Sequence, residues 1–175
     1  SATSRPRVKA SSRRNRMVVL GRLPLKTRCG AIAAMLAAGL DANAGRWANV
    51  VEEGSFGWGL LAVAAPNGGT VGQGAVEGFI GNDDSAASRK SAFLVAGLAG
   101  LGRLSESDAG ALAGDLDVDL ARQTRWSRAI ARAAEVGNPA LVVFLAGLGM
   151  QGSSWEQMTP LHLYHITAAL NRVGM

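Results

Sequence analysis

The sequence predicts an all-α fold: an irregular bundle or short α-solenoid of about nine short helices, with a basic, extended N-terminal arm. Three observations predict it. Of the 175 residues, 48% are hydrophobic, 5% are aromatic and 23 are glycine, a mixture that suits closely packed helices better than sheets. Alternation of apolar and polar residues, the mark of a half-buried strand, is not seen. Short helical patterns are instead separated by Gly, Pro, Asn and Asp.

The charge distribution divides the chain into an arm, residues 1–29, and a helical domain, residues 30–175. Nine of the 18 basic residues precede Cys29, and the first acidic residue is Asp41. Residues 29–175 carry nine bases and 13 acids, so they are mildly acidic. A basic arm binds nucleic acid, an anionic membrane surface or an acidic partner, or only solubilises the chain. The candidate nucleic-acid-binding residues of the arm are Arg5, Arg7, Lys9, Arg13, Arg14 and Arg16.

The segment Met17–Ala44 has the order of a secretory signal: basic residues, then the apolar stretch Ala31–Leu40, then Ala-Asn-Ala. We expect a first core helix instead, because the chain begins sixteen residues before this segment. The expected location is therefore the cytoplasm, and the alternative is the cell envelope if the segment derives from a signal. No apolar run reaches the ~18–20 residues that span a bilayer as a helix, so no transmembrane segment is predicted.

Residues 30–80 divide into three helical patterns and one ambiguous segment. Ile and Leu recur every four residues after Gly30, which predicts the first helix. Asp41 caps a second helix, which glycine ends at position 54, and Ser55 caps a third, which proline ends at position 66. The segment Val71–Ile80 contains too many glycines to predict a helix.

In the middle of the chain, capping residues again mark where each helix is predicted to begin. A helix is predicted over Ala86–Leu104, and Ser105 caps a short helix after it. The next helix opens at Asp117 or Asp119 and runs to Glu135.

Two further helix starts are predicted near the C-terminus, beyond the helix that Pro139 begins. Ser153 and Glu156 form a capping-box pattern, and Thr159 caps the last helix with proline at its first position. This helix ends two residues before the chain does, as expected if the natural protein continues beyond Met175.

A short internal repeat accompanies these helices. Leu98–Gly102 recurs as Leu145–Gly149, with an offset of 47 residues. Periods of about 40–47 residues suit helix-pair or helix-triplet repeats. The alternative is that Ala/Leu/Gly-rich helices resemble each other by composition alone.

One glycine pattern raises the question of a cofactor. Gly147–Gly152 fits the G-x-G-x-x-G pattern of dinucleotide-binding loops. Only 23 residues follow Gly152, and no acidic residue follows Glu156 to hold a ribose. We therefore expect no nucleotide or other cofactor.

The histidines His162 and His165 lie one helical turn apart, so they share a face and are the candidates for a metal site. Zinc needs at least one more ligand, and nothing in the sequence brings Cys29 or Glu156 near. We expect the pair to pack in or near the core without a metal. Because motifs for a nucleophile, a P-loop or a zinc protease are also missing, we predict no catalytic residue and no enzyme activity.

Four arginines lie in the helix predicted to end at Glu135, with a tryptophan among them. They are Arg122, Arg125, Arg128 and Arg132, and their spacing of three, three and four residues brings them near one helical face. Such a ridge binds an anion or nucleic acid, or is the solvated face of an amphipathic helix. The candidate partner-binding residues are Arg122, Arg125, Arg128, Arg132, Trp126 and Trp155.

These features predict a non-catalytic helical module, a scaffold that binds another protein or a second copy of itself through a groove. The first alternative is a nucleic-acid-associated protein that uses the arm and the arginine ridge, and its binding would fall steeply with salt. The second alternative is an accessory helical domain of a cell-envelope protein.

Overall fold

The computed structural model describes residues 24–65, 68–152 and 154–175, and within them every side chain except those of Leu25 and Trp155. In these residues the fold is all-helical, with nine α-helices and no strand, so the predicted fold class is confirmed. The elements are α2 (Leu25–Ala37), α3 (Asp41–Gly45), α4 (Phe56–Ala64), α5 (Gln73–Gly81), η1 (Ala86–Ser88), α6 (Arg89–Gly100), α7 (Glu106–Asp115), α8 (Arg125–Glu135), α9 (Pro139–Gly149), η2 (Trp155–Gln157) and α10 (Pro160–Arg172).

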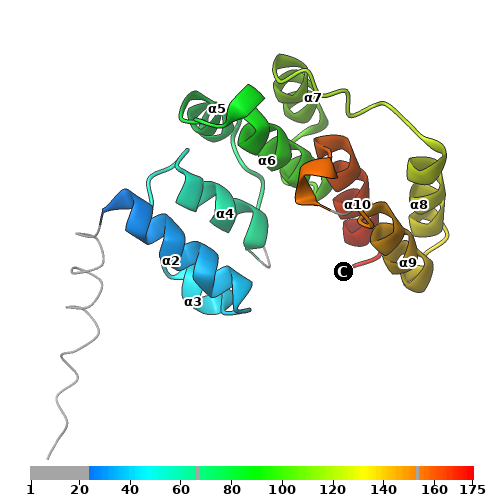
Figure 1. The fold of residues 1–175 in the computed structure, drawn as a ribbon, viewed down its shortest axis with the longest axis horizontal. Coiled ribbons are helices and arrows are strands. Elements are labelled where there is room, and N and C mark those ends of the chain that lie inside the picture. Colours follow the sequence, from blue (N-terminus) through cyan, green and yellow to red (C-terminus); the bar gives the residue numbers. More distant parts are fainter. Residues whose placement is uncertain (1–23, 66–67, 153) are drawn as a thin grey trace, which may run out of the picture.

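Helices α6 and α10 pack side by side near the centre of the molecule and make its most extensive helix–helix contact (Figure 1). On one side α2 packs on α4 and α4 on α6, and on the other side α8 and α9 pack on each other and on α10. One apolar cluster joins α5, α6 and α7 around Val95 and Leu98. A second cluster joins α8, α9 and α10 around Ile130 and Ile166.

Several helix starts lie where the sequence predicts them. Ser55, Ser105 and Thr159 each accept a hydrogen bond from the backbone N–H three residues on, at 3.3, 3.1 and 3.2 Å. Pro139 is the first residue of α9, and the side chain of Asn138 caps that helix at 3.0 Å. These caps satisfy N–H groups that have no partner within the helix.

The start of α8 differs from the prediction. A helix was expected to open at Asp117 or Asp119, but α8 begins only after Thr124. Asp117 has φ 55°, a left-handed conformation that interrupts a right-handed helix. Thr124 and Ser127 then form a reciprocal capping box, with hydrogen bonds of 2.8 and 3.0 Å. Arg122 consequently lies in the loop before α8, off the predicted helical ridge.

Two other elements also differ. The helix after Asp41 is shorter than predicted, because α3 has five residues and the chain continues in turns to Gly54. The segment Val71–Ile80, which was ambiguous, contains most of α5. Val76 and Phe79 are buried there, and their packing outweighs the low helix propensity of the glycines.

Helix α2 begins at Leu25, inside residues 1–29, which we assigned to the arm. Pro24 precedes the helix with φ −54°, which suits a helix start. Ile32 is fully buried, and Arg28 donates a hydrogen bond of 2.9 Å to a carbonyl oxygen after α3. The described part of Met17–Ala44 thus belongs to the folded body. Outside the described residues lie Ser153 and the arm candidates Arg5, Arg7, Lys9, Arg13, Arg14 and Arg16.

Both copies of the internal repeat are helical, in α6 and α9, but their burial differs. Leu98 is fully buried, whereas its counterpart Leu145 is half-buried. Leu148 in the second copy is 46% exposed. The two segments therefore do not pack equivalently, and the repeat itself stays a prediction.

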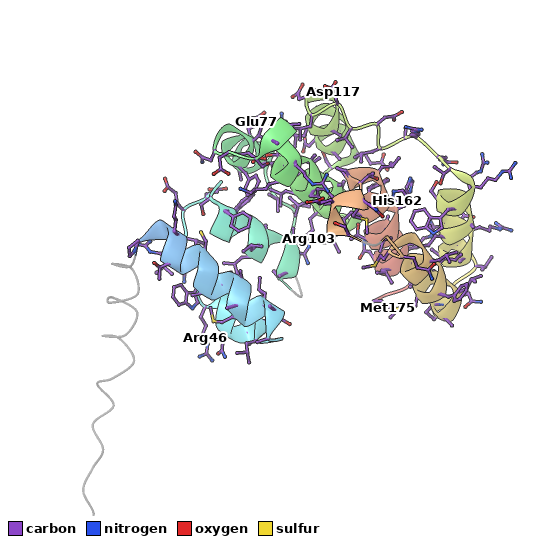
Figure 2. All side chains as sticks on the ribbon, in the orientation of Figure 1. Arg46, Glu77, Arg103, Asp117, His162 and Met175 are labelled. Atoms are coloured by element: carbon purple, nitrogen blue, oxygen red, sulfur yellow. The ribbon has the colours of Figure 1, made fainter. Side chains whose placement is uncertain are left out.

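Two arginines tie distant segments to the ends of α6. The Arg103 guanidinium lies beside the C-terminal end of α4 and donates to carbonyl oxygens between Ala62 and Ala65 (Figure 2). These carbonyls have no partner within the helix. The Arg89 guanidinium donates to two carbonyl oxygens of Glu156–Met158, both at 3.1 Å. Arg103 thereby fastens the end of α4, and Arg89 the segment before α10, to the ends of α6.

Candidate interaction surfaces

A groove of about 590 Å³ lies between α4 and the pair α6 and α10. Large apolar side chains of five helices, α2, α4, α5, α6 and α10, line it, and its polar lining residues are Ser85, Arg89 and Lys90. We call it the apolar groove. Its apolar lining includes Leu36, Phe56, Leu60, Val63, Phe93 and Leu163.

The sequence of α4 explains why this surface is open. Phe56, Leu60 and Val63 follow steps of four and three residues, so they share one helical face. Gly57 and Gly59 flank this face and let α4 approach its neighbours; a β-carbon at Gly59 would lie 2.7 Å from the phenyl ring of α5. The glycines are buried, whereas Phe56 is 46% and Val63 37% exposed.

Two cations lie over aromatic rings at the end of the apolar groove near the start of α6. Lys90 Nζ is 5.7 Å from the ring centroid of Phe56, and the Arg89 guanidinium is 4.9 Å from that of Phe93. Lys90 Nζ also forms an ion pair with Asp84 at 2.6 Å. The groove is therefore apolar along its length, and at one end it presents the Arg89 guanidinium and the Lys90–Asp84 ion pair.

A second apolar surface is the outward side of α9. Leu141, Phe144 and Leu148 follow steps of three and four residues and are 42%, 66% and 46% exposed. Val142 and Ala146 on the other side of α9 are buried against the core. We call the three exposed residues the α9 face. It is convex, whereas the apolar groove is concave.

The predicted arginine ridge is present in part. Arg125, Arg128 and Arg132 are exposed on α8, and Arg132 forms an ion pair with Glu135 at 3.2 Å. Trp126, in contrast, is half-buried and donates a hydrogen bond from Nε1 to the Leu145 carbonyl oxygen at 2.9 Å. It joins α8 to α9. The side chain of Trp155 lies outside the described part of the structure.

The two histidines pack around Trp126. The His162 ring lies 5.0 Å from the indole, and the His165 ring 6.4 Å from it. His162 Nδ1 is 2.8 Å from Thr159 Oγ1, and His165 Nε2 is 3.2 Å from the Arg122 carbonyl oxygen. Burial lowers the pKa of His165, although the hydrogen bond to this carbonyl works against that shift. Among the described residues, no group of three or more His, Cys, Asp or Glu is placed to hold a metal ion.

The Gly147–Gly152 pattern does not have the surroundings of a dinucleotide site. The segment before it is the helix α9 and not a strand. Gly149 provides room for the indole of Trp126, which lies directly against it. Packing therefore accounts for this glycine.

A second concave surface, of about 740 Å³, lies along α7 and the loop that follows it. Its floor is made of small and apolar residues, with Tyr164 of α10 at one side. Glu106, Asp117 and Asp119 line it and are exposed. We call it the acidic groove.

The residues of the apolar groove were not among those that sequence reasoning singled out. The signal for Phe56, Leu60 and Val63 is their helical spacing between flanking glycines. The signal is ambiguous, because the same spacing is typical of a buried core face. Only the positions of α6 and α10 show that this face is left open.

None of the described helices is both long enough and apolar enough to cross a membrane. No protein-family model, curated protein or solved structure shows significant similarity to this chain.

Proposed function

We propose that this protein is a non-catalytic interaction module that binds an amphipathic helix of a partner protein in the apolar groove. The observation that carries the proposal is the concave apolar lining contributed by five helices, with Phe56 and Val63 left open to solvent. Large exposed apolar residues gathered in a concavity are typical of ligand and partner sites.

A helix is the occupant that best fits the lining. Phe56, Leu60 and Val63 present a ridge with helical spacing, and Phe93 and Leu163 face it from the other wall. An amphipathic helix places apolar anchors at positions i, i+3 or i+4, and i+7 into such a groove. Fully burying one large apolar side chain contributes about 1.5–3 kcal/mol. A few anchors therefore supply most of the binding energy.

The charge at one end of the groove defines the partner further. Lys90 and Arg89 lie there beside the first turn of α6, where the carboxylates of Asp83 and Asp84 offset part of their positive charge. A partner helix with acidic residues at the end that meets α6 fits this arrangement. Added salt would then slow the association of the partner helix, because it screens the charges. It would have little effect on the binding energy that comes from burying apolar side chains.

The test is a selection from a displayed library of amphipathic helices, followed by affinity measurements on two variants. Phe56→Asp places a charge in the groove, and acidic residues are favourable in the first turn of a helix, so α4 is expected to form. Phe144→Asp is the matched control on the α9 face. We expect selected helices to lose at least about tenfold in affinity for Phe56→Asp and to bind Phe144→Asp normally.

The opposite pattern contradicts the proposal. If Phe144→Asp abolishes binding and Phe56→Asp does not, the α9 face is the interaction surface. If the library yields no binder above background, the apolar groove does not take a helix. Circular dichroism and thermal melts of both variants separate lost binding from lost folding.

Nucleic-acid binding remains the second candidate function, supported by the exposed Arg125, Arg128 and Arg132 of α8. A labelled oligonucleotide is the probe. Binding that falls steeply with salt, and that weakens in an Arg125→Ala/Arg128→Ala variant, would favour this function. Binding insensitive to both changes would exclude a role for α8.

A further inference from the structure

We propose that the acidic groove binds the basic segment, residues 5–16, of a second copy of this chain. This inference goes beyond the proposed function, because it concerns a different surface and a different occupant. It rests on the shape of the groove, on the charge of its rim and on the charge of the segment.

The groove is lined by small and apolar residues together with three carboxylates. Its volume is about 740 Å³, and Leu104, Ala109 and Ala113 form part of the floor. The small residues of α7 keep the floor shallow, so an extended chain can lie on it. The rim carboxylates belong to Glu106, Asp117 and Asp119.

The stretch of chain that lines most of the groove is rich in acidic residues. Residues 104–121 contain five acids and no base. The preceding base, Arg103, is directed to the carbonyl oxygens of α4. The ion pairs found in the described part of the chain are Lys90–Asp84 and Arg132–Glu135, so none of them involves the rim. The rim charges are therefore available to a cationic occupant.

The chain itself contains the complementary segment. Residues 5–16 hold six bases and no acid, and the apolar residues Met17–Leu20 follow directly. Arginine forms bidentate hydrogen bonds with carboxylates, and an adjoining apolar stretch suits an apolar floor.

A second copy is the source that the topology favours. The basic segment precedes α2, which packs on α3 and α4, whereas α7 packs on α5 and α6 across the molecule (Figure 1). If two copies exchange their segments reciprocally, a closed dimer with two such contacts results. One-way exchange instead gives an open chain of copies.

The first experiment uses the full chain and a fluorescent synthetic peptide of residues 5–20. Peptide anisotropy is titrated at low and high salt, at protein concentrations below self-association. The variant Asp117→Asn/Asp119→Asn removes two rim charges. Asparagine tolerates the left-handed φ of position 117 and can still accept the 3.0 Å hydrogen bond that Asp119 receives from Ala121. The matched control is Glu52→Gln/Glu53→Gln, with the same change in net charge.

We expect the peptide to bind wild type, with an affinity about fivefold or more weaker for the rim variant and about unchanged for the control. Equal weakening of both variants would show unspecific attraction and overturn the proposal. The second experiment is sedimentation of the full chain. Wild type is expected to form dimers or larger assemblies at low salt, and the rim variant to sediment as a monomer. A wild-type monomer at low salt would exclude a second copy as the occupant, even if the peptide binds.

Discussion

The indole of Trp126 lies so close to Gly149 that a β-carbon on the glycine would overlap its six-membered ring. The ring cannot easily move away. Its Nε1 is hydrogen-bonded to the Leu145 carbonyl oxygen at 2.9 Å, and the His162 ring lies 5.0 Å from it. This contact therefore fixes how α8, α9 and α10 fit together.

The first prediction follows from that contact. Gly149→Ala is expected to lower the free energy of unfolding by about 1–3 kcal/mol, because an added methyl group overpacks the site. The control is Gly147→Ala in the same helix, where a β-carbon would meet nothing within 4 Å. It is expected to be neutral or to stabilise by up to about 1 kcal/mol through helix propensity. Urea denaturation measures both, and equal values for the two variants would refute the prediction.

A second prediction concerns the contact of α6 with α10. A β-carbon at Gly100 would lie 2.7 Å from the Tyr164 carbonyl oxygen and 3.0 Å from the Ala168 nitrogen. Because these are backbone atoms of α10, Gly100→Ala must separate the two helices. We expect a loss of about 2–4 kcal/mol and a fall in Tm of about 5–10 °C.

The control for this prediction is Gly97→Ala on the same helix. Its β-carbon would lie 3.8 Å from a methyl group of Leu163, which is ordinary van der Waals contact. It is expected to keep the wild-type Tm or raise it. If Gly100→Ala and Gly97→Ala have the same Tm, the close approach of α6 and α10 at Gly100 does not contribute to the stability of the protein.

The helix starts could be predicted where a local signal is sufficient. Ser55, Ser105 and Thr159 cap helices because each side chain reaches an N–H three residues on, which needs no distant partner. The start of α8 could not be predicted. Two aspartates before it resemble caps, while the pair that caps it, Thr124 and Ser127, lacks the usual Glu or Gln.

The candidate surfaces depend on contacts between distant segments. The spacing of Phe56, Leu60 and Val63 predicts an apolar face, but not whether another helix covers it. That depends on Phe93 and Leu163, which lie on α6 and α10 far along the chain. The arginine ridge was predicted better, because the spacing of three exposed arginines is a property of α8 alone.

A third prediction uses the carboxylate that organises the turn before α6. Burial works to raise the pKa of Asp83, but hydrogen bonds of 2.6–2.8 Å from Ser85 and Ser91 outweigh it and lower the pKa to about 2. The pKa in the folded state is therefore below the unfolded value of about 3.9. The resulting stability is present above about pH 4 and is lost as the pH falls toward about 2.

The variant Asp83→Asn removes this dependence. Between about pH 4 and pH 2, we expect wild type to lose about 1 kcal/mol more of its free energy of unfolding than this variant. The difference is no larger because the carboxylate is partly solvated. Asp84→Asn is the comparison: the hydrogen bond and ion pair with Lys90 also lower the pKa of Asp84, but this carboxylate is exposed, so we expect a smaller change in the pH profile than for Asp83→Asn. Parallel pH profiles for wild type and Asp83→Asn would contradict the assignment.

The fourth prediction concerns His165, whose pKa burial lowers in the folded state. Its ordinary value is about 6.5, so the unfolded chain takes up the proton first as the pH falls. The contribution to stability is therefore complete above about pH 6.5 and is lost as the pH decreases through the lower folded-state pKa.

His165→Gln stays neutral and can still donate to the Arg122 carbonyl oxygen. We expect the free energy of unfolding of His165→Gln to depend less on pH than that of wild type between about pH 7 and pH 5. The variant His162→Gln is expected to keep more of the wild-type dependence. Denaturation curves across that range would decide, and a slope that persists in His165→Gln would assign the dependence to another group.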